Sequence, residues 1–304
     1  MVQRRLRVVT TVAPITNLVA VVAGGTASVV GVVPEGRNSH TFEPAPSAVA
    51  ALQDADVVFL NGLSLDASLS ELAAANLGTS GELCELGTTV LPPERYLYDF
   101  SFPESGGNPN PHLWTNPPMA RQYAELIRDV LVARDPRHAD GYRSNAAVLI
   151  GRIDELDVAI RTATATIPVE QRQLLTYHDA YAYFADEYGW TVLGAVQPSS
   201  FDEPTPRDVA DLIRQVEASS VPAVFGSEVF PSPVLRQIAA ETGARYVDDL
   251  RDDDLPGDVG DPDHTWLALM QFNYVTIVEA VGGDASALRS FDPVIGLVDE
   301  AEYP

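Results

Sequence analysis

Short apolar runs alternate along the chain with segments whose apolar residues recur every three or four positions. The runs Leu6–Val12, Val29–Val33 and Val57–Leu60 predict buried strands in the first part of the chain. The segments between them predict helices, because Pro, Gly or a capping residue bounds each one. Repeated strand–helix units of this kind favour open α/β sheets with mostly parallel strands.

The second part of the chain repeats this alternation. It contains a further helix over Val234–Thr242, an acidic loop over residues 248–263, a helix over Thr265–Val281 and an irregular tail. Its predicted strands are Leu174–Tyr177, Thr191–Val196, Ala223–Phe225 and Arg245–Val247.

One long helix is predicted between the two parts. Apolar residues from Tyr142 to Ala163 recur at spacings of three or four, which indicates a helix from about Arg137 to Ala165. At 1.5 Å per residue it would be about 40 Å long, and its position suits a rigid connector. The predicted organisation is an N-terminal lobe over residues 1–135, a connector over 136–166 and a C-terminal lobe over 167–304.

Composition excludes several function classes. The 304 residues include 43 acidic and 19 basic side chains, a formal net charge of −24, so nucleic-acid binding is not expected. All the basic residues are arginine, which removes Schiff-base chemistry and the lysine of a phosphate-binding loop. The single cysteine, Cys84, cannot form an internal disulfide, and one thiolate is not enough to hold a metal ion in a cysteine site. With no apolar segment of signal-peptide or transmembrane length, the chain as given is expected to be soluble and without a leader peptide.

Two of the five histidines lie where an open α/β sheet places its ligands, and a third lies at the end of a long loop. His40 follows the strand Val29–Val33, His178 directly follows a strand of the second half, and His112 ends a loop rich in proline and glycine. Three neutral imidazoles suit zinc, and also copper, iron or nickel. A carboxylate from the acidic run 252–254 would complete a tetrahedral set.

The remaining candidates have weaker support. His138 and His264 are interpreted as residues at helix starts, His264 with a smaller chance of lying near the mouth of the site. Glu43 lies three residues after His40. Its carboxylate could either orient that imidazole through a hydrogen bond or accept from backbone amides of its own loop. Glu228 follows a strand and suits an orienting group, an extra ligand or a general base.

Several motifs, in order along nearly the whole chain, resemble those of the metal-specific solute-binding proteins of ABC importers for zinc and manganese. The segment His40–Pro46 is similar to the pattern H-x-[YF]-E-P-x-P, and Pro111–Trp114 is similar to D-P-H-x-W. His178–Tyr181 resembles the start of [HE]-x-A-F-x-Y-F, and the Asp-x-aliphatic pattern before the last helix fits Asp253–Leu255.

The resemblance implies two α/β lobes joined by a rigid helix, with the metal between them. It assigns His40, His112, His178 and Asp253 as ligands, with Asp254 and Asp248 as alternatives to the carboxylate. The chain departs from the family at Asn110, where an aspartate is usual. It also lacks the histidine-rich loop of many zinc members, which leaves open whether a metallochaperone loads the site.

The expected function is an extracytoplasmic zinc-binding protein that delivers metal to the membrane permease of an ABC importer. Its expected location is periplasmic or extracellular, either free or lipid-anchored at the cell surface. The chain is expected to be a monomer. No catalytic activity is expected, because four protein ligands leave no position on the metal for water. Zinc is preferred over manganese, which favours more oxygen ligands. The alternatives are a manganese-specific member, an adhesin or metal buffer with the same fold, and a zinc hydrolase using Glu228 or Glu43 as base.

Overall fold

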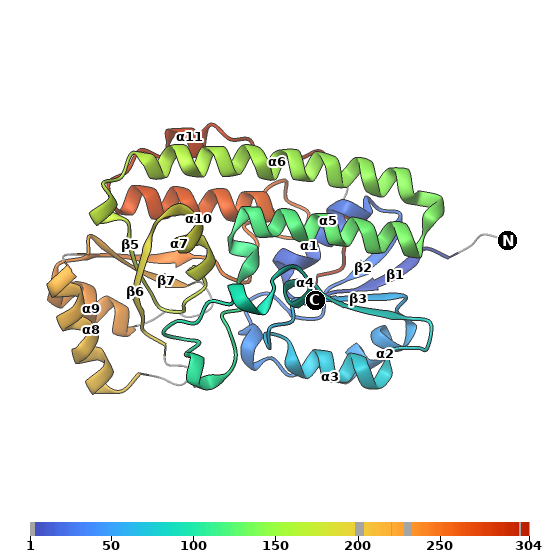
Figure 1. The fold of residues 1–304 in the computed structure, drawn as a ribbon, viewed down its shortest axis with the longest axis horizontal. Helices are drawn as coiled ribbons and strands as arrows, with labels where there is room; N and C mark the ends of the chain where they lie inside the picture. The colour runs from blue at the N-terminus through green and yellow to red at the C-terminus, as the bar shows by residue number, and fades with distance from the viewer. Residues whose placement is uncertain (1–3, 198–203, 220, 228–232, 298, 304) are drawn as a thin grey trace.

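The chain folds into two α/β lobes side by side beneath a layer of long helices (Figure 1). The computed structural model describes residues 4–197, 204–219, 221–227, 233–297 and 299–303. Within these residues each lobe contains one four-stranded sheet, and every strand pairing is parallel. The predicted α/β class, with two open parallel lobes and one long connecting helix, is confirmed.

The two sheets share one topology. The N-terminal sheet has the order β2-β1-β3-β4 and the C-terminal sheet the order β6-β5-β7-β8. In each, the chain moves outward from the first strand and then crosses back, so the strand order reverses beside β1 and beside β5. Ligands of open α/β sheets bind beyond the carboxyl ends of the strands at such reversals. The strands are β1 Leu6–Val9, β2 Ala27–Val30, β3 Val57–Leu60, β4 Glu82–Glu85, β5 Gln173–Thr176, β6 Thr191–Ala195, β7 Ala223–Ser227 and β8 Arg245–Leu250.

The helices fall into an upper layer that covers both lobes and outer helices that belong to one lobe (Figure 1). The α-helices are α1 Ala13–Ala23, α2 Pro46–Asp54, α3 Ala67–Asn76, α4 Leu86–Val90, α5 Pro117–Arg134, α6 Ala139–Ala165, α7 Ala182–Tyr188, α8 Pro206–Ser219, α9 Pro233–Thr242, α10 Trp266–Ala280 and α11 Ser286–Arg289. Short 3-10 turns are η1 Ser39–Thr41, η2 Pro93–Arg95, η3 Glu104–Gly106, η4 Leu113–Thr115, η5 Pro136–His138 and η6 Val169–Gln171. No described helix is both long and apolar enough to cross a bilayer.

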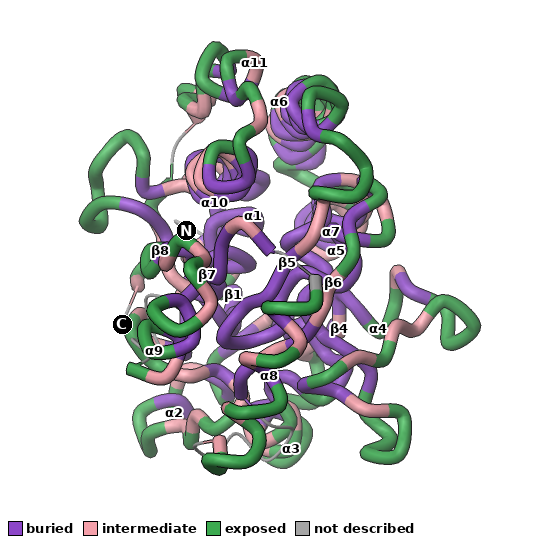
Figure 2. Tube along the Cα trace, turned by 90° about the vertical axis from the view of Figure 1, so that its left-hand side faces the viewer, coloured by how far each residue is buried: buried purple, intermediate pink, exposed green. Residues whose placement is uncertain are grey.

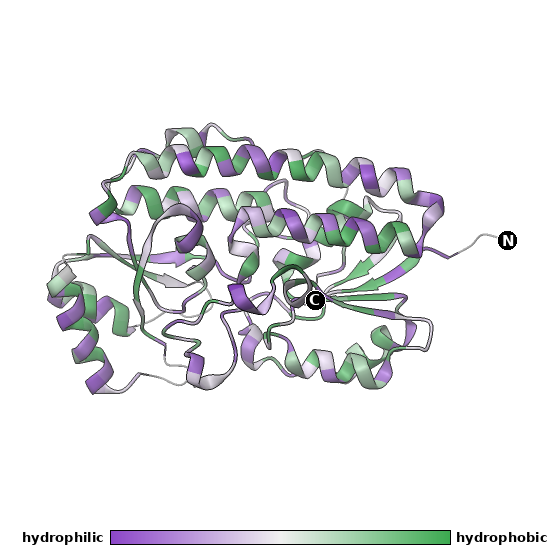
Figure 3. Cartoon of the chain, in the orientation of Figure 1, coloured by the Kyte–Doolittle hydropathy of each residue, from purple (hydrophilic) through white to green (hydrophobic). Residues whose placement is uncertain are grey.

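Helix α6 runs above both lobes and packs on α1, α5, α10 and α11. Its buried residues, from Tyr142 to Ala163, recur on one face, and its other face is mostly polar, with Val148 and Val158 exposed on it (Figure 3). One continuous apolar cluster joins α1, α5, α6 and α10 to the inner faces of both sheets. Smaller clusters lie under the outer helices of each lobe, and the surfaces of α2, α3 and α8 that face away are largely exposed (Figure 2). The shared cluster couples the two lobes through packing rather than through the loops between them.

Four predictions about local structure are wrong. Strand β1 ends at Val9 rather than Val12, and β2 spans Ala27–Val30 rather than Val29–Val33. Strand β8 does not stop at Val247 but continues to Leu250, because it pairs with β7 past a register shift. The tail is not simply irregular: it forms α11 and then returns to the N-terminal lobe, where Glu302 bridges Val30 in parallel. The amide of Glu302 donates to the Val29 carbonyl, and Gly31 donates to the Glu302 carbonyl, both at 2.9 Å. The tail thus covers the edge of β2.

Candidate metal site

Three loops from the two lobes bring three histidines to one point. His40 lies in η1 after β2, where the Asn38 side chain accepts a hydrogen bond from the His40 amide at 2.9 Å. His112 immediately precedes η4, and His178 follows β5 of the other lobe. The N-terminal lobe therefore supplies two imidazoles and the C-terminal lobe one, as the position of sites in open α/β sheets predicts.

The three imidazoles point their Nε2 atoms at one another. The Nε2–Nε2 distances are 3.2 Å from His40 to His112, 3.2 Å from His40 to His178 and 3.0 Å from His112 to His178. Ligand nitrogens around a tetrahedral zinc at 2.0–2.1 Å lie about 3.3 Å apart. His112 and His178 are 1% and 3% exposed, and His40 is partly buried. Among the described residues, these three form the one group of at least three potential ligands with donor atoms all within 4.8 Å.

Two carboxamides fix which nitrogen of His112 and of His178 carries the proton. The Nδ1 of His112 lies 2.9 Å from Asn110 Oδ1, and the Nδ1 of His178 lies 3.1 Å from Gln197 Oε1. The amide nitrogen of Asn110 donates to Asp99 at 2.6 Å and to the Asp179 carbonyl at 2.7 Å, so its oxygen must face His112. An amide oxygen only accepts, so each Nδ1 is the donor and each neutral Nε2 is left as an acceptor.

Burial keeps all three imidazoles neutral. It lowers the pKa of His40 and of His112 well below the ordinary value, and the neighbouring imidazoles lower them further. Burial also lowers the pKa of His178 to about 4, although its bond to Gln197 acts in the opposite direction. Neutral imidazole is the form that binds a metal, so the set is ready for a cation at neutral pH.

A buried pair of carboxyl groups lies behind Asn110. Burial raises the pKa of Asp179 well above its ordinary range, and the nearby Asp99 raises it further. Burial also raises the pKa of Asp99, against the hydrogen bonds from Asn110 and from the amides of Phe102 and Ser101. Asn110 therefore connects His112 to the pair, in place of the direct carboxylate contact that an aspartate there would give.

Asp253 lies beside this cluster but outside the group of three. Its side chain is buried, its Oδ2 accepts from the Ser39 amide at 3.4 Å, and Ser39 directly precedes His40. Its other oxygen, Oδ1, is buried without a hydrogen-bond partner within the described structure. Burial raises the pKa of Asp253 to about 6, against the bonds from Ser39. A buried carboxylate oxygen without a partner is costly, which is the condition a metal ligand relieves.

The other two carboxylates considered from the sequence have different surroundings. Asp248 is exposed and lies within β8, whose extension to Leu250 the sequence did not predict. Both carboxylate oxygens of Asp254 accept from the Gly36 amide at 2.9 Å. Of the three, Asp253 is therefore the one whose side chain has a buried oxygen to offer.

Reciprocal hydrogen bonds connect the loop of His40 to the loop of Asp253. Gly36 donates its amide to Asp254, and Glu35 Oε1 accepts from the Leu255 amide at 2.9 Å. His264, which is buried before α10, lies with Nε2 4.0 Å from Glu35 Oε1. We call the Glu35–Leu255 and Gly36–Asp254 bonds the inter-lobe clasp, since they join one loop of each lobe.

The structure excludes one of the two interpretations left open for Glu43. Glu43 is exposed and accepts from Ser68 Oγ at 3.5 Å, so it does not orient His40. Asn110 and Gln197 orient His112 and His178 instead. The sequence did not predict this role for either residue. Glu228 lies outside the described residues.

The two histidines at helix starts have separate surroundings. His138 lies in η5 and contacts Asp135, with Nδ1 2.5 Å from the Asp135 carboxylate. His264 Nδ1 lies 3.3 Å from the Pro256 carbonyl, and its ring packs on Tyr303 from the tail. Neither belongs to the imidazole group.

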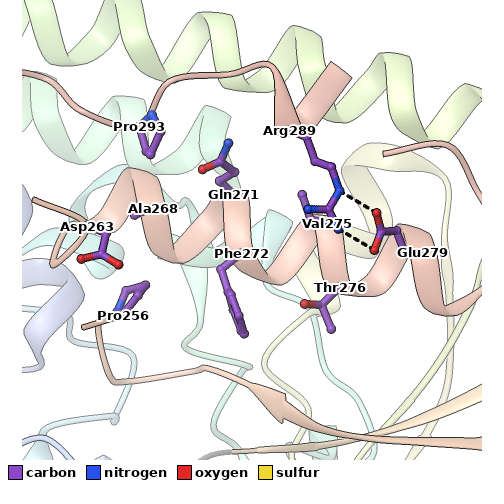
Figure 4. A pocket seen from close by; sticks show the side chains of 10 residues that line it. All are labelled: Pro256, Asp263, Ala268, Gln271, Phe272, Val275, Thr276, Glu279, Arg289 and Pro293. Atoms are coloured by element: carbon purple, nitrogen blue, oxygen red, sulfur yellow. Dashed lines mark hydrogen bonds and ion pairs between the residues drawn. The ribbon is translucent and has the colours of Figure 1, made fainter. Parts of the chain in front are cut away.

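A separate groove of about 420 Å³ lies along α10 (Figure 4). Asp263 lies at one end, and the ion pair between Arg289 and Glu279 lies at the other, with Phe272 between them (Figure 4). Its lining includes none of the three imidazoles and not Asp253. The groove is thus unrelated to the metal site.

A comparison with protein families identifies the class of this chain. The model of the family described as "ZnuA: Zinc-uptake complex component A periplasmic" matches residues 8–280. The chain belongs to this family of solute-binding proteins, and it is a metal-binding component of an ABC importer. The resemblance inferred from the sequence motifs and the expected extracytoplasmic location are confirmed.

Individual relatives differ in the metal that their names give. The chain is 30% identical to the iron-binding protein YfeA of Yersinia pestis, over 92% of this chain and 87% of that protein. It is 31% identical to the manganese-binding lipoprotein MntA of Halalkalibacterium halodurans, over 91% of this chain and 88% of that one. The solved periplasmic zinc-binding protein TroA of Treponema pallidum has the same fold, with a TM-score of 0.82 and 23% identity over 91% of this chain and 99% of TroA.

Proposed function

We propose that the chain binds one zinc ion between its lobes, through His40, His112, His178 and Asp253, and delivers it to a membrane permease. One observation carries this proposal: the Nε2 lone pairs of His112 and His178 converge at 3.0 Å while both Nδ1 protons are held elsewhere. Two acceptors this close repel each other unless a cation lies between them. The third imidazole, at 3.2 Å from each, adds a nitrogen on the same side.

Zinc is the proposed substrate because of the donor set. Three imidazole nitrogens and one carboxylate suit zinc, whereas manganese prefers more oxygen ligands. Names of relatives include iron and manganese as well as zinc, so the family alone does not choose the ion. The carboxylate also offsets charge, since three neutral imidazoles leave the ion with its full double charge.

Four protein ligands would make the site a carrier rather than a catalytic centre. A filled tetrahedral site leaves no position for a water molecule to be activated, so we propose that the chain is not an enzyme. The hydrolase alternative loses one of its two bases, because Glu43 is exposed and bonded to Ser68. We propose that the chain acts as a monomer whose partners are the metal and the permease.

The test is metal analysis of the purified protein followed by competition titration between zinc and manganese. One ion per chain and tighter binding of zinc are expected. Metal content near two per chain would contradict the single site, and tighter binding of manganese would reverse the choice of ion. Hydrolysis of a model ester or peptide by the zinc-loaded protein would favour the hydrolase, because it requires an open coordination position.

A further inference from the structure

A hollow of about 290 Å³ opens beside the metal site on the side of the N-terminal lobe. His40 and Phe102 line it together with Leu63, Ser64 and Asn108. Of the three imidazoles, His40 is the one that appears among the described lining residues. The hollow therefore reaches the metal site at His40, while His112 and His178 lie behind other atoms.

Phe102 is placed between the hollow and the imidazoles. Its ring centroid lies 5.3 Å from that of His40, 5.6 Å from that of His112 and 5.8 Å from that of His178. The residue is only 8% exposed, although it belongs to a long loop. An apolar ring in contact with all three imidazoles keeps water away from the point where their nitrogens meet.

The segment that carries Phe102 is held at its base and only loosely tied to the other lobe at Ser101. Asp99 Oδ1 accepts from the amides of Ser101 and Phe102, both at 3.0 Å. At Ser101 the contacts to the C-terminal lobe are long: Ser101 Oγ donates to the Gln197 carbonyl at 3.4 Å and accepts from the Asp179 amide at 3.4 Å. The firmer ties to that lobe lie at the base of the segment, where the Leu97 amide donates to the Tyr183 hydroxyl at 3.2 Å and Asp99 pairs with Asp179. Bonds of 3.4 Å are weak, so the part of the segment next to Phe102 can leave the C-terminal lobe at low cost while its base stays attached.

The opposite rim of the hollow is fixed. Leu63 and Ser64 have φ angles of +52° and +66°, the left-handed conformation that side-chain-bearing residues seldom adopt. Such a turn persists only where the surroundings hold it, and here Leu63 is buried and its amide donates to Thr88 Oγ1 of α4 at 3.2 Å. In the rim that carries Phe102, Ser101 bonds instead to loop residues of both lobes, so we assign the opening to that rim.

We propose that Phe102 is the gate of the metal site and that the hollow is the route by which zinc reaches and leaves the imidazoles. This inference rests on the proposed function. A divalent ion arrives with its water shell, which cannot pass a ring packed on all three imidazoles. Movement of the ring exposes the Nε2 atoms in turn, starting with His40, and its return excludes water. The gate sets the rates of capture and release rather than the affinity.

The experiment measures zinc association and dissociation by stopped flow, using a fluorescent chelator as competitor, for wild type, Phe102→Ala and Phe100→Ala. Phe100 is the matched control, because it lies on the same segment and is 53% exposed. Removal of the gate ring is expected to raise both rate constants by about tenfold or more, with a smaller change in Kd, whereas the control keeps wild-type rates.

Equal rates for the two variants overturn the gate, and so does a rise in the dissociation rate alone, which would make Phe102 a positioning residue. Phe102→Leu replaces the alanine variant if that one does not fold, and wild-type rates in the leucine variant then overturn the gate. Failure of the wild-type protein to bind zinc would refute the proposed function instead. The two failures are therefore distinguishable.

Discussion

The imidazole side and the carboxylate side of the proposed metal site differ in how completely they are assembled. On the imidazole side, three Nε2 atoms lie within 3.2 Å of one another, and amide oxygens orient two of the rings. On the other side, Asp253 is held by a 3.4 Å bond from Ser39 and stays outside the 4.8 Å group. The nitrogens are thus set by packing within and between the lobes, whereas the carboxylate depends on how two loops meet.

This difference separates two tasks. A preassembled set of neutral nitrogens attracts a cation without rearrangement, which favours tight binding. A carboxylate on a loop whose contacts to the imidazole side are mainly hydrogen bonds can approach or leave the ion, which suits a carrier that must release its substrate. The imidazole side is therefore expected to govern whether zinc binds, and the carboxylate side how strongly it is retained.

The largest expected effect comes from breaking the imidazole side. His112→Ala removes the most deeply buried imidazole of the three. Zinc affinity should fall by about three orders of magnitude or more, because the proposed tetrahedral site loses a ligand. The measurement is competition titration with a chelator of known affinity. His138→Ala is the control and should bind like wild type, since His138 contacts Asp135 far from the site in sequence. Retention of tight binding by His112→Ala would remove the imidazole set from the metal site.

A second test uses the pH dependence of stability in metal-free protein. The pKa of His178 is about 4 in the folded chain, and an unfolded chain restores the ordinary value of about 6.5. Between these two pH values only the unfolded chain binds the proton. The stability that neutral His178 contributes to the folded chain is therefore fully present above about pH 6.5 and is lost as the pH falls towards 4. The loss amounts to about 3 kcal/mol near pH 4.

Denaturant unfolding of wild type and His178→Gln at pH 7 and pH 4 measures this contribution, because the variant has no imidazole at this position. Wild type should lose more stability than the variant over the interval. Parallel losses in the two proteins would mean that burial does not hold His178 neutral.

The sequence predicted the imidazole side better than the carboxylate side, for a physical reason. His40 and His178 follow strands, and parallel strands place their carboxyl ends at one edge whatever the loop details. Choosing among the acidic residues required the exact end of β8, and a register shift in its pairing with β7 carries the strand past Val247. Tertiary pairing of this kind leaves no trace in local hydrophobic periodicity.

The orienting residues show the same limit. Gln197 follows β6, the neighbour of β5, so the rule that selected His178 also selects its partner once the strand order is known. Asn110 stood out only as a departure from the family pattern, and its function became visible through its bonds to Asp99 and Asp179. The return of the tail to Val30 involves Glu302, in a segment with no periodicity to predict it.

Breaking the carboxylate side should have a smaller effect than loss of an imidazole. Asp253→Ala is expected to weaken zinc binding by about 50-fold, because water takes the vacated position while three nitrogens remain. Asp248→Ala is the matched control, since Asp248 is exposed on β8. Both are measured by the same competition titration. Wild-type affinity in Asp253→Ala, with a loss in Asp254→Ala or Asp248→Ala, would move the carboxylate ligand to that residue.

The smallest expected effect addresses the inter-lobe clasp, which joins the loop of His40 to the residues that follow Asp253. Glu35 Oε1 accepts from the Leu255 amide at 2.9 Å, two residues beyond Asp253. Glu35→Ala removes that acceptor, and one hydrogen bond is worth about 1 kcal/mol, so zinc affinity should fall by about fivefold. Glu35→Gln keeps an oxygen that can accept from the same amide and should restore most of the loss.

A matched control and the zinc dissociation rate decide whether the clasp acts on the metal through Asp253. Glu43→Ala removes an exposed glutamate from the same loop and should leave affinity unchanged. If the clasp holds the carboxylate, Glu35→Ala raises the dissociation rate in the wild-type background but has no further effect in Asp253→Ala, since the group it positions is then absent. Additive losses in the double variant would show that Glu35 acts on the imidazoles instead. The carboxylate side would then be part of the same preassembled unit, and the contrast between the two sides would not hold.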